Sequence, residues 1–198
     1  MQQKLLLASA SPRRQQLLQQ IGVAFDLVEH SVHEQRQAGE SATQFTRRMS
    51  EEKARSALDK WQDNEGRVVL AADTAVVCAG EIMGKPKDRN DAIAMLSQLS
   101  GAEHTVFSAV TVGTVDSRQT LVSQTTVEFR SIQQQEIINY WNTGEPRDKA
   151  GAYGIQGYAA VFVRSLSGSY SGVMGLPLYE TAQLLQAYSI TGTGSLNS

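Results

Sequence analysis

The chain has 198 residues, of which 41% are hydrophobic and 19% are charged, and its formal net charge is −2. A chain of this size can form one sizeable domain, or two small lobes that share a core. Nucleic-acid-binding domains are usually strongly basic, so this charge argues against a nucleic-acid partner. No apolar run has the length of a membrane-spanning helix, so no membrane partner is expected. The single cysteine, Cys78, cannot form an internal disulfide and favours a reducing compartment, the cytoplasm.

The first half of the sequence alternates strand and helix patterns. We expect strand Lys4–Ala8, helix Pro12–Gln20, strand Phe25–Val28, a polar loop over residues 30–40, a helix from Ser41 to about Trp61, and strands Val68–Ala72 and Ala75–Ala79. In the first helix, Ser11 suits the N-cap, Pro12 the first turn and Gly22 the position after the end. Asp73 and Thr74 interrupt an apolar run. This predicts either a turn between two strands or a strand-end carboxylate that acts as a base or a Mg²⁺ ligand.

The second half contains a long hairpin between helical segments. We expect a loop at Gly84–Lys87, a helix capped by Asp88 and ending near Gly101, paired strands Thr105–Val115 and Leu121–Arg130, helix Gln133–Asn142, a glycine-rich loop Gly144–Gly157, strand Tyr158–Ser165, a loop from Leu166 to Gly175, and helix Pro177–Tyr188. Early alternation with a central hairpin predicts an α/β fold with a mixed sheet. Residues 1–190 are expected to form one domain, and 191–198 a flexible tail.

Two arginines stand where a helix disfavours cations. Arg13 and Arg14 fall in the first helical turn, where a positive charge typically costs a few tenths to about 1 kcal/mol. A helix start also exposes backbone N–H groups, and guanidinium forks match phosphate oxygens. This segment therefore predicts either a polyphosphate site or arginines that face water.

Other polar residues give weaker signals when each is considered alone. Lys85, held by Pro86, could aim its ammonium at phosphate or lie in a surface turn. The glycines at 151, 154 and 157 let a backbone approach a ligand closely, although a glycine-rich connection between strands would explain them equally well. Gln156 offers donors and acceptors that suit a base edge. Glu34 and Lys53 alone are typical of a solvated loop and a solvated helix face.

Taken together, these stretches occur in the order seen in a known family. They are Ala8–Arg14, Glu34–Arg36, Glu52–Ala54, Ala72–Thr74, Gly84–Pro86, Asp148–Gly157 and Val173–Pro177. The chain resembles the Maf family of nucleoside triphosphate pyrophosphatases over about residues 4–188, most specifically in S-P-R-R and D-K-A-G-A-Y-G-I-Q-G. The resemblance implies a Maf/Ham1-like (inosine-triphosphatase-like) α/β fold, in which two lobes flank an elongated mixed sheet around a nucleotide cleft.

The resemblance also implies an activity. Maf proteins hydrolyse nucleoside triphosphates to the monophosphate and pyrophosphate with a divalent cation; they are cytoplasmic, often dimeric, and linked to inhibition of septum formation. At Arg13, Thr74 and Gln156 the chain resembles the branch that prefers dTTP and UTP. We therefore expect a dTTP/UTP pyrophosphatase, acting on these or on modified pyrimidine nucleotides, with a homodimer as one expectation.

On this interpretation each candidate residue has a role. Ser9, Arg13 and Arg14 would grip the triphosphate, and Lys53 and Lys85 would add charge around it. Glu34, with or without Asp73, would hold Mg²⁺ or Mn²⁺, and the family assigns Asp73 as the proton acceptor; whether Asp73 is base or metal ligand stays open. Thr74 and Gln156 would read the edge of thymine or uracil. The alternative is a nucleotide-binding regulator of septum formation that needs no catalysis.

Overall fold

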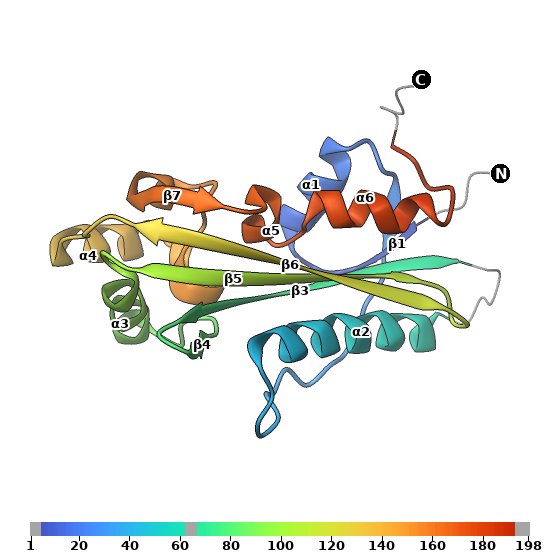
Figure 1. The fold of residues 1–198 in the computed structure, drawn as a ribbon, viewed down its shortest axis with the longest axis horizontal. Helices are drawn as coiled ribbons and strands as arrows, with labels where there is room; N and C mark the ends of the chain where they lie inside the picture. Colours follow the sequence, from blue (N-terminus) through green and yellow to red (C-terminus); the bar gives the residue numbers. More distant parts are fainter. Residues whose placement is uncertain (1–4, 62–66, 193–198) are drawn as a thin grey trace.

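A computed structural model describes residues 5–61 and 67–192 (Figure 1). Its elements in chain order are β1 (Leu5–Ala8), α1 (Pro12–Gln20), β2 (Phe25–Leu27), α2 (Ala42–Lys60), β3 (Val68–Cys78), β4 (Glu81–Met83), α3 (Arg89–Leu99), β5 (Glu103–Gly113), β6 (Arg118–Phe129), α4 (Gln134–Asn142), the short 3-10 helices η1 (Glu145–Asp148), η2 (Ala150–Ala152) and η3 (Tyr158–Phe162), β7 (Val163–Ser167), α5 (Tyr170–Met174) and α6 (Leu178–Gln186). No helix within the described ranges is long and apolar enough to cross a membrane.

The strands form one mixed, seven-stranded sheet, which confirms the predicted α/β fold class. Its order is β2-β1-β3-β5-β6-β7, with β4 paired to β3. The β2, β1 and β3 strands are parallel, and the other pairs are antiparallel. The long strands β3, β5 and β6 run the length of the molecule and make the sheet elongated (Figure 1).

Helices cover both faces of the sheet at one end of the molecule. In Figure 1, α2 lies below the sheet, and α1, α5 and α6 lie above it. The β1 strand is buried on both faces: Leu5 and Leu7 pack with residues of α1 and α6, while Leu6 and Ala8 pack with residues of α2. At the other end, α3, α4 and η3 enclose a separate aromatic core that includes Tyr140 and Phe162.

Along one edge of β3, the neighbouring strand changes from β1 to β4. β3 pairs with β1 over residues 68–71 and with β4 over residues 76–78. Within the described residues, positions 72–75 have a strand partner only on the β5 side. Because β1 ends at Ala8 and the chain then turns into α1, the edge of β3 is left open beside a helix start.

Several expected boundaries were wrong. β3 is continuous through Asp73 and Thr74 and keeps its register with β5 there, so neither the predicted turn nor a strand end lies at Asp73. The strand predicted from Tyr158 begins only at Val163, because the five residues before it form η3. The short elements β4 and α5 were missed, since three to five residues carry too little periodicity. Lys4 and residues 193–198, part of the predicted first strand and tail, lie outside the described residues.

His104 is buried in the aromatic core and lacks one hydrogen-bond partner. Its side chain packs edge-on against Phe129 and Tyr153, and its Nε2 lies 2.8 Å from the Tyr153 hydroxyl. Its Nδ1 has no partner within the described residues. Burial lowers the pKa of His104 to about 4, because the charged ring would lose its hydration.

We therefore expect His104 to make the fold sensitive to acid. An unfolded histidine titrates near pH 6.5, so between about pH 6.5 and 4 the unfolded chain binds a proton that the folded chain does not, and the free energy of unfolding falls as pH falls. The full effect is roughly 3 kcal/mol. Urea unfolding at pH 7 and 4.5 should show a smaller loss for His104→Phe than for the wild type. Equal losses would contradict a neutral, buried His104.

Candidate active site

A cleft opens beside the free edge of β3. It has a volume of about 790 Å³. All nine residues that the sequence predicted as functional line it: Ser9, Arg13, Arg14, Glu34, Lys53, Asp73, Thr74, Lys85 and Gln156. The cleft lies at the carboxyl end of β1, where ligands commonly bind in open α/β sheets. The fold thus brings residues from distant segments into one site.

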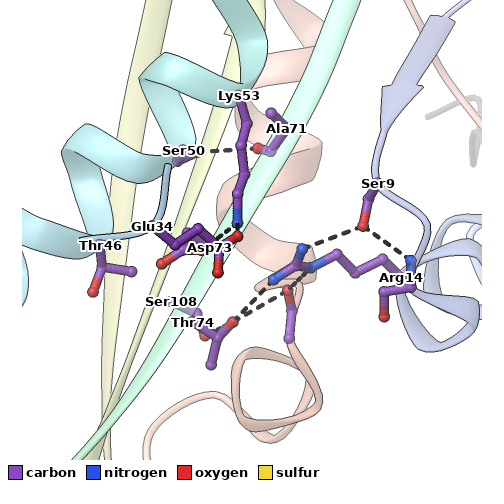
Figure 2. A network of polar contacts seen from close by, with 12 residues as sticks. Ser9, Arg14, Glu34, Thr46, Ser50, Lys53, Ala71, Asp73, Thr74 and Ser108 are labelled. Carbon is purple, nitrogen blue, oxygen red and sulfur yellow. Dashed lines mark hydrogen bonds and ion pairs between the residues drawn. The ribbon is translucent and has the colours of Figure 1, made fainter. Parts of the chain in front are cut away.

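Arg14 forms one wall of the cleft (Figure 2). Its Nε donates to the Gly175 carbonyl at 2.7 Å, its Nη1 to Ser9 Oγ at 3.2 Å, and its Nη2 to Thr74 Oγ1 at 3.4 Å. Burial lowers the pKa of Arg14 while Asp73 opposes this shift, and a guanidinium stays charged in proteins. Among the described residues, Arg14 donates only to neutral acceptors, and no carboxylate forms an ion pair with it. Its positive charge is therefore held in place and available to an anion.

The start of α1 lies next to Arg14. Ser11 occupies the N-cap position with extended backbone, as predicted, but its side chain makes no capping hydrogen bond. Its own amide instead donates to Ser9 Oγ at 3.2 Å. The amides of the first turn are thus not satisfied by the N-cap side chain, which suits an anion at this helix end.

Arg13 connects the start of α1 to the end of η1. Its Nη1 lies 3.2 Å from Asp148 Oδ2, and Lys149 Nζ lies 2.7 Å from the other oxygen of the same carboxylate. The Asp148 side chain is 62% exposed. Exposed ion pairs contribute little, typically about 0–1 kcal/mol, so an incoming anion can replace Asp148 as the partner of Arg13.

Lys53 joins two carboxylates on the other wall (Figure 2). It projects from α2, and its side chain is only 5% exposed. Its Nζ lies 2.6 Å from Asp73 Oδ1 and 2.5 Å from Glu34 Oε1. The ammonium is therefore engaged by carboxylates, whereas the sequence interpretation placed it beside phosphate.

The two carboxylates differ in their environments. Burial raises the pKa of Asp73, although Lys53 and Arg14 oppose the shift. Burial acts in the same direction on Glu34, but its hydrogen bond to Lys53 and the nearby charges of Lys53, Lys85 and Arg14 outweigh it, so the pKa of Glu34 is lowered. The environment of Asp73 thus favours uptake of a proton, whereas that of Glu34 favours the charged carboxylate, so Asp73 is the candidate proton acceptor.

Thr74 follows Asp73 but points to the opposite face of the sheet, towards Arg14. Its hydroxyl lies 3.1 Å from Ser108 Oγ, which itself donates to the Gly172 carbonyl at 2.6 Å. Because the Ser108 proton is used there, Ser108 accepts from Thr74, and Thr74 accepts from Arg14. Sequence reasoning missed Ser108, since a serine in a strand pattern carries no signal of its own.

The glycine-rich segment packs against the protein itself. A Cβ at Gly151, whose φ is +68°, would crowd Val76, and a Cβ at Gly157 would clash with the Glu145 carboxylate. That carboxylate accepts from the Tyr140 hydroxyl at 2.7 Å and holds the segment in place. Packing within the protein therefore accounts for Gly151 and Gly157 without a ligand approaching the backbone there.

Lys85 and Gln156 are exposed at the rim of the cleft. Lys85 lies two residues after the end of β4, and Gln156 lies between η2 and η3. Within the described part of the chain, neither side chain has a hydrogen bond or ion pair. Both are thus free to contact a ligand. The cleft is also lined by His30, Phe45 and Tyr153, which the sequence did not single out.

The acidic residues fit a divalent cation only together with a ligand. Glu34 and Asp73 supply the hard oxygen donors that Mg²⁺ and Mn²⁺ prefer. No group of three or more metal-binding side chains occurs among the described residues. Mg²⁺ commonly uses one or two carboxylates and completes its coordination with substrate phosphates and water, so this donor set fits that arrangement.

Fold and site together define an α/β protein with a cationic wall and an acidic wall in one cleft, suited to a polyphosphate. Comparison of the sequence with family models identifies the family to which this protein belongs. The model described as "Maf-like protein" matches residues 4–188, so the chain belongs to the Maf-like family, as the sequence motifs predicted.

Curated relatives cover nearly the whole chain. The dTTP/UTP pyrophosphatase of Vibrio vulnificus (strain YJ016) is 46% identical over 185 residues, which are 93% of this chain and 98% of that protein. The dTTP/UTP pyrophosphatase of Saccharophagus degradans is 48% identical over 188 residues, or 94% and 89% of the two chains. The solved Ham1 protein of Staphylococcus aureus aligns with a TM-score of 0.39 and 12% identity over 64% of this chain and 72% of that chain. The family assignment therefore rests on the sequence matches.

Proposed function

We propose that this chain hydrolyses dTTP and UTP, or modified pyrimidine nucleoside triphosphates, to the monophosphate and pyrophosphate. The observation that carries the proposal is a single cleft with Arg14 on one wall and the Lys53–Asp73–Glu34 cluster on the other. Cleavage of a phosphoanhydride needs both features, cations at the phosphates and carboxylates that bind metal and accept a proton. The names of relatives at 46% and 48% identity support the same reaction.

In this proposal, the triphosphate binds along the α1 wall. The amides at the start of α1 and the fixed guanidinium of Arg14 contact its oxygens, and Arg13 exchanges Asp148 for phosphate. Lys85 adds a flexible charge from the rim. Ser9 acts through Arg14, which it holds by a hydrogen bond.

The carboxylates act at the α-phosphorus. A divalent cation, Mg²⁺ or Mn²⁺, held by Glu34 would neutralise phosphate charge and lower the pKa of water. Asp73 uses Oδ1 for Lys53, and its Oδ2 has no hydrogen bond within the described residues, so Oδ2 can accept a proton from water. The water oxygen bonds to the α-phosphorus, the bond to the bridging oxygen breaks, and pyrophosphate leaves.

Base selection is assigned to the exposed amide of Gln156, with Thr74 as the second expected contact. An amide can accept from N3–H of uracil or thymine while donating to a carbonyl beside it. Gln156→Glu should reduce kcat/KM for UTP about tenfold more than for CTP, because a carboxylate repels the uracil carbonyls and can accept from the cytosine amino group. Steady-state kinetics on both nucleotides measure this, and equal losses would contradict base reading by Gln156.

Other features of the family stay predictions for this chain. They are a cytoplasmic location, a homodimer, a link to septum formation and a single domain over residues 1–190. The alternative of a nucleotide-binding regulator uses the same cationic wall, but binding alone does not require Asp73 and Glu34 around a buried lysine.

Product analysis tests the proposed function. Purified protein is incubated with Mg²⁺ and with dTTP, UTP, CTP, ATP, GTP or 7-methyl-GTP, and pyrophosphate and orthophosphate are assayed. Release of pyrophosphate from dTTP and UTP much faster than from the other nucleotides is the expected result. Orthophosphate as the only product would overturn the reaction. Binding of dTTP without cleavage by any divalent metal would favour the regulator.

A further inference from the structure

Glu34 lies on a segment without helix or strand. This segment, residues 28–41, joins β2 to α2, and we call it the Glu34 loop. An irregular segment holds a side chain within the tolerance that catalysis needs only if other groups fix it. The contacts made by α2 identify those groups.

The Arg48 guanidinium on α2 makes four hydrogen bonds. Its Nε and Nη2 donate to the two carboxylate oxygens of Glu40 at 2.7 and 2.8 Å. Its Nη2 also donates to the Gln35 carbonyl at 3.0 Å, and its Nη1 donates to Glu52 Oε1 at 3.1 Å. Arg48 therefore binds both Glu40, at the far end of the Glu34 loop, and the carbonyl of Gln35, the residue after Glu34.

Glu40, which is bound by Arg48, makes further hydrogen bonds within the Glu34 loop. Its side chain is only 8% exposed, and the hydrogen bonds from Arg48 lower its pKa to about 2. Its Oε2 also accepts from the Gln37 amide at 3.0 Å, and its carbonyl accepts from Arg36 Nε at 2.7 Å. The paired charges thus organise the Glu34 loop from position 35 to position 40.

We propose that Arg48 is a positioning residue for the reaction: through Gln35 and Glu40 it holds the Glu34 carboxylate beside Lys53 and Asp73. This inference rests on the proposed function. Arg48 does not line the cleft, so it acts through Glu34 and not on substrate. A lysine could not replace it, because only the planar guanidinium fork reaches Glu40 bidentately and Gln35 at the same time.

The experiment compares Arg48→Lys, Arg48→Met and Glu40→Gln with a control, Arg55→Met, which removes an exposed arginine from the same helix. Each variant is assayed for kcat and KM with dTTP. Binding of Mn²⁺ in the presence of a non-hydrolysable dTTP analogue is measured by calorimetry, and amide hydrogen exchange over residues 31–40 reports the order of the Glu34 loop. Melting temperatures report global stability.

We expect both Arg48 variants to lose at least tenfold in kcat, with KM for dTTP within about threefold of wild type, because the phosphate-binding wall is untouched. Mn²⁺ binding should weaken, and the Gln37 amide should exchange at least tenfold faster. Glu40→Gln should show the same pattern more weakly, since the amide keeps one acceptor. The control should match the wild type in every measurement.

Two outcomes would overturn the inference. One is faster exchange in the Glu34 loop with unchanged kcat and Mn²⁺ binding. The other is a loss of kcat that has a cause other than the loop: the exchange of the Glu34 loop is unchanged, or the loss of kcat only follows a fall in melting temperature. If the wild type releases no pyrophosphate, the proposed function fails separately, and Mn²⁺ binding with loop exchange still decides whether Arg48 positions Glu34.

Discussion

Replacing Asp73 by asparagine is expected to lower kcat for dTTP by about 10²–10⁴-fold, the range typical of a lost general base. Asparagine has nearly the same shape, but it cannot accept the proton. Lys53 keeps Glu34 as an ion-pair partner, so the fold should survive. Arg14 and the start of α1 are unchanged, and the affinity for dTTP should stay within about threefold. Single-turnover kinetics and dTTP binding measure the two effects.

Asp59→Asn is the matched control, since Asp59 is an exposed carboxylate on α2, the helix that carries Lys53. It should leave kcat unchanged. Turnover of Asp73→Asn within a few fold of wild type would show that the catalytic assignment is wrong. A loss of dTTP affinity as large as the loss of kcat would instead assign Asp73 to substrate binding.

Much of the fold could be predicted because its signals are local. Asp88 accepts from the Asp91 amide as the expected N-cap, and Gly22 has the positive φ of a residue that follows a helix. The predicted hairpin is the β5–β6 pair. The turn considered at Asp73 was wrong because the cost of burying its carboxylate in a strand was judged from neighbouring residues in the sequence alone. A strand can carry a buried carboxylate there only because Lys53, on α2, pairs with it.

The composition of the candidate site was predictable, but its internal contacts were not. The resemblance to the Maf family placed nine side chains in one site, and they line one cleft. That Lys53 bridges Glu34 and Asp73 depends on how α2 packs across β3, which no sequence spacing encodes. The role of Ser108 depends equally on the β3–β5 register, which sets it opposite Thr74.

The Lys53 bridge leads to the second large effect. Lys53→Met should lower kcat/KM by about 10³-fold, since it removes the charge that keeps Asp73 ionised and Glu34 in place. Removing one partner of a buried ion pair typically costs about 3–5 kcal/mol. Burial already raises the pKa of Asp73 against the opposing charge of Lys53, so without that charge the pKa rises further.

The sign of the pH dependence follows from this shift. A carboxyl whose folded pKa lies above its unfolded pKa stabilises the fold at low pH, and that stabilisation is lost as pH rises through the folded pKa. The deficit of Lys53→Met against the wild type in urea unfolding should therefore be larger at pH 8 than at pH 5, and the acid limb of kcat/KM should move to higher pH. Lys53→Arg, which keeps a charge, should retain much of the stability at both pH values. A deficit independent of pH would mean that Lys53 does not control the ionisation of Asp73, and the role of Asp73 as the base would then need another source of charge compensation.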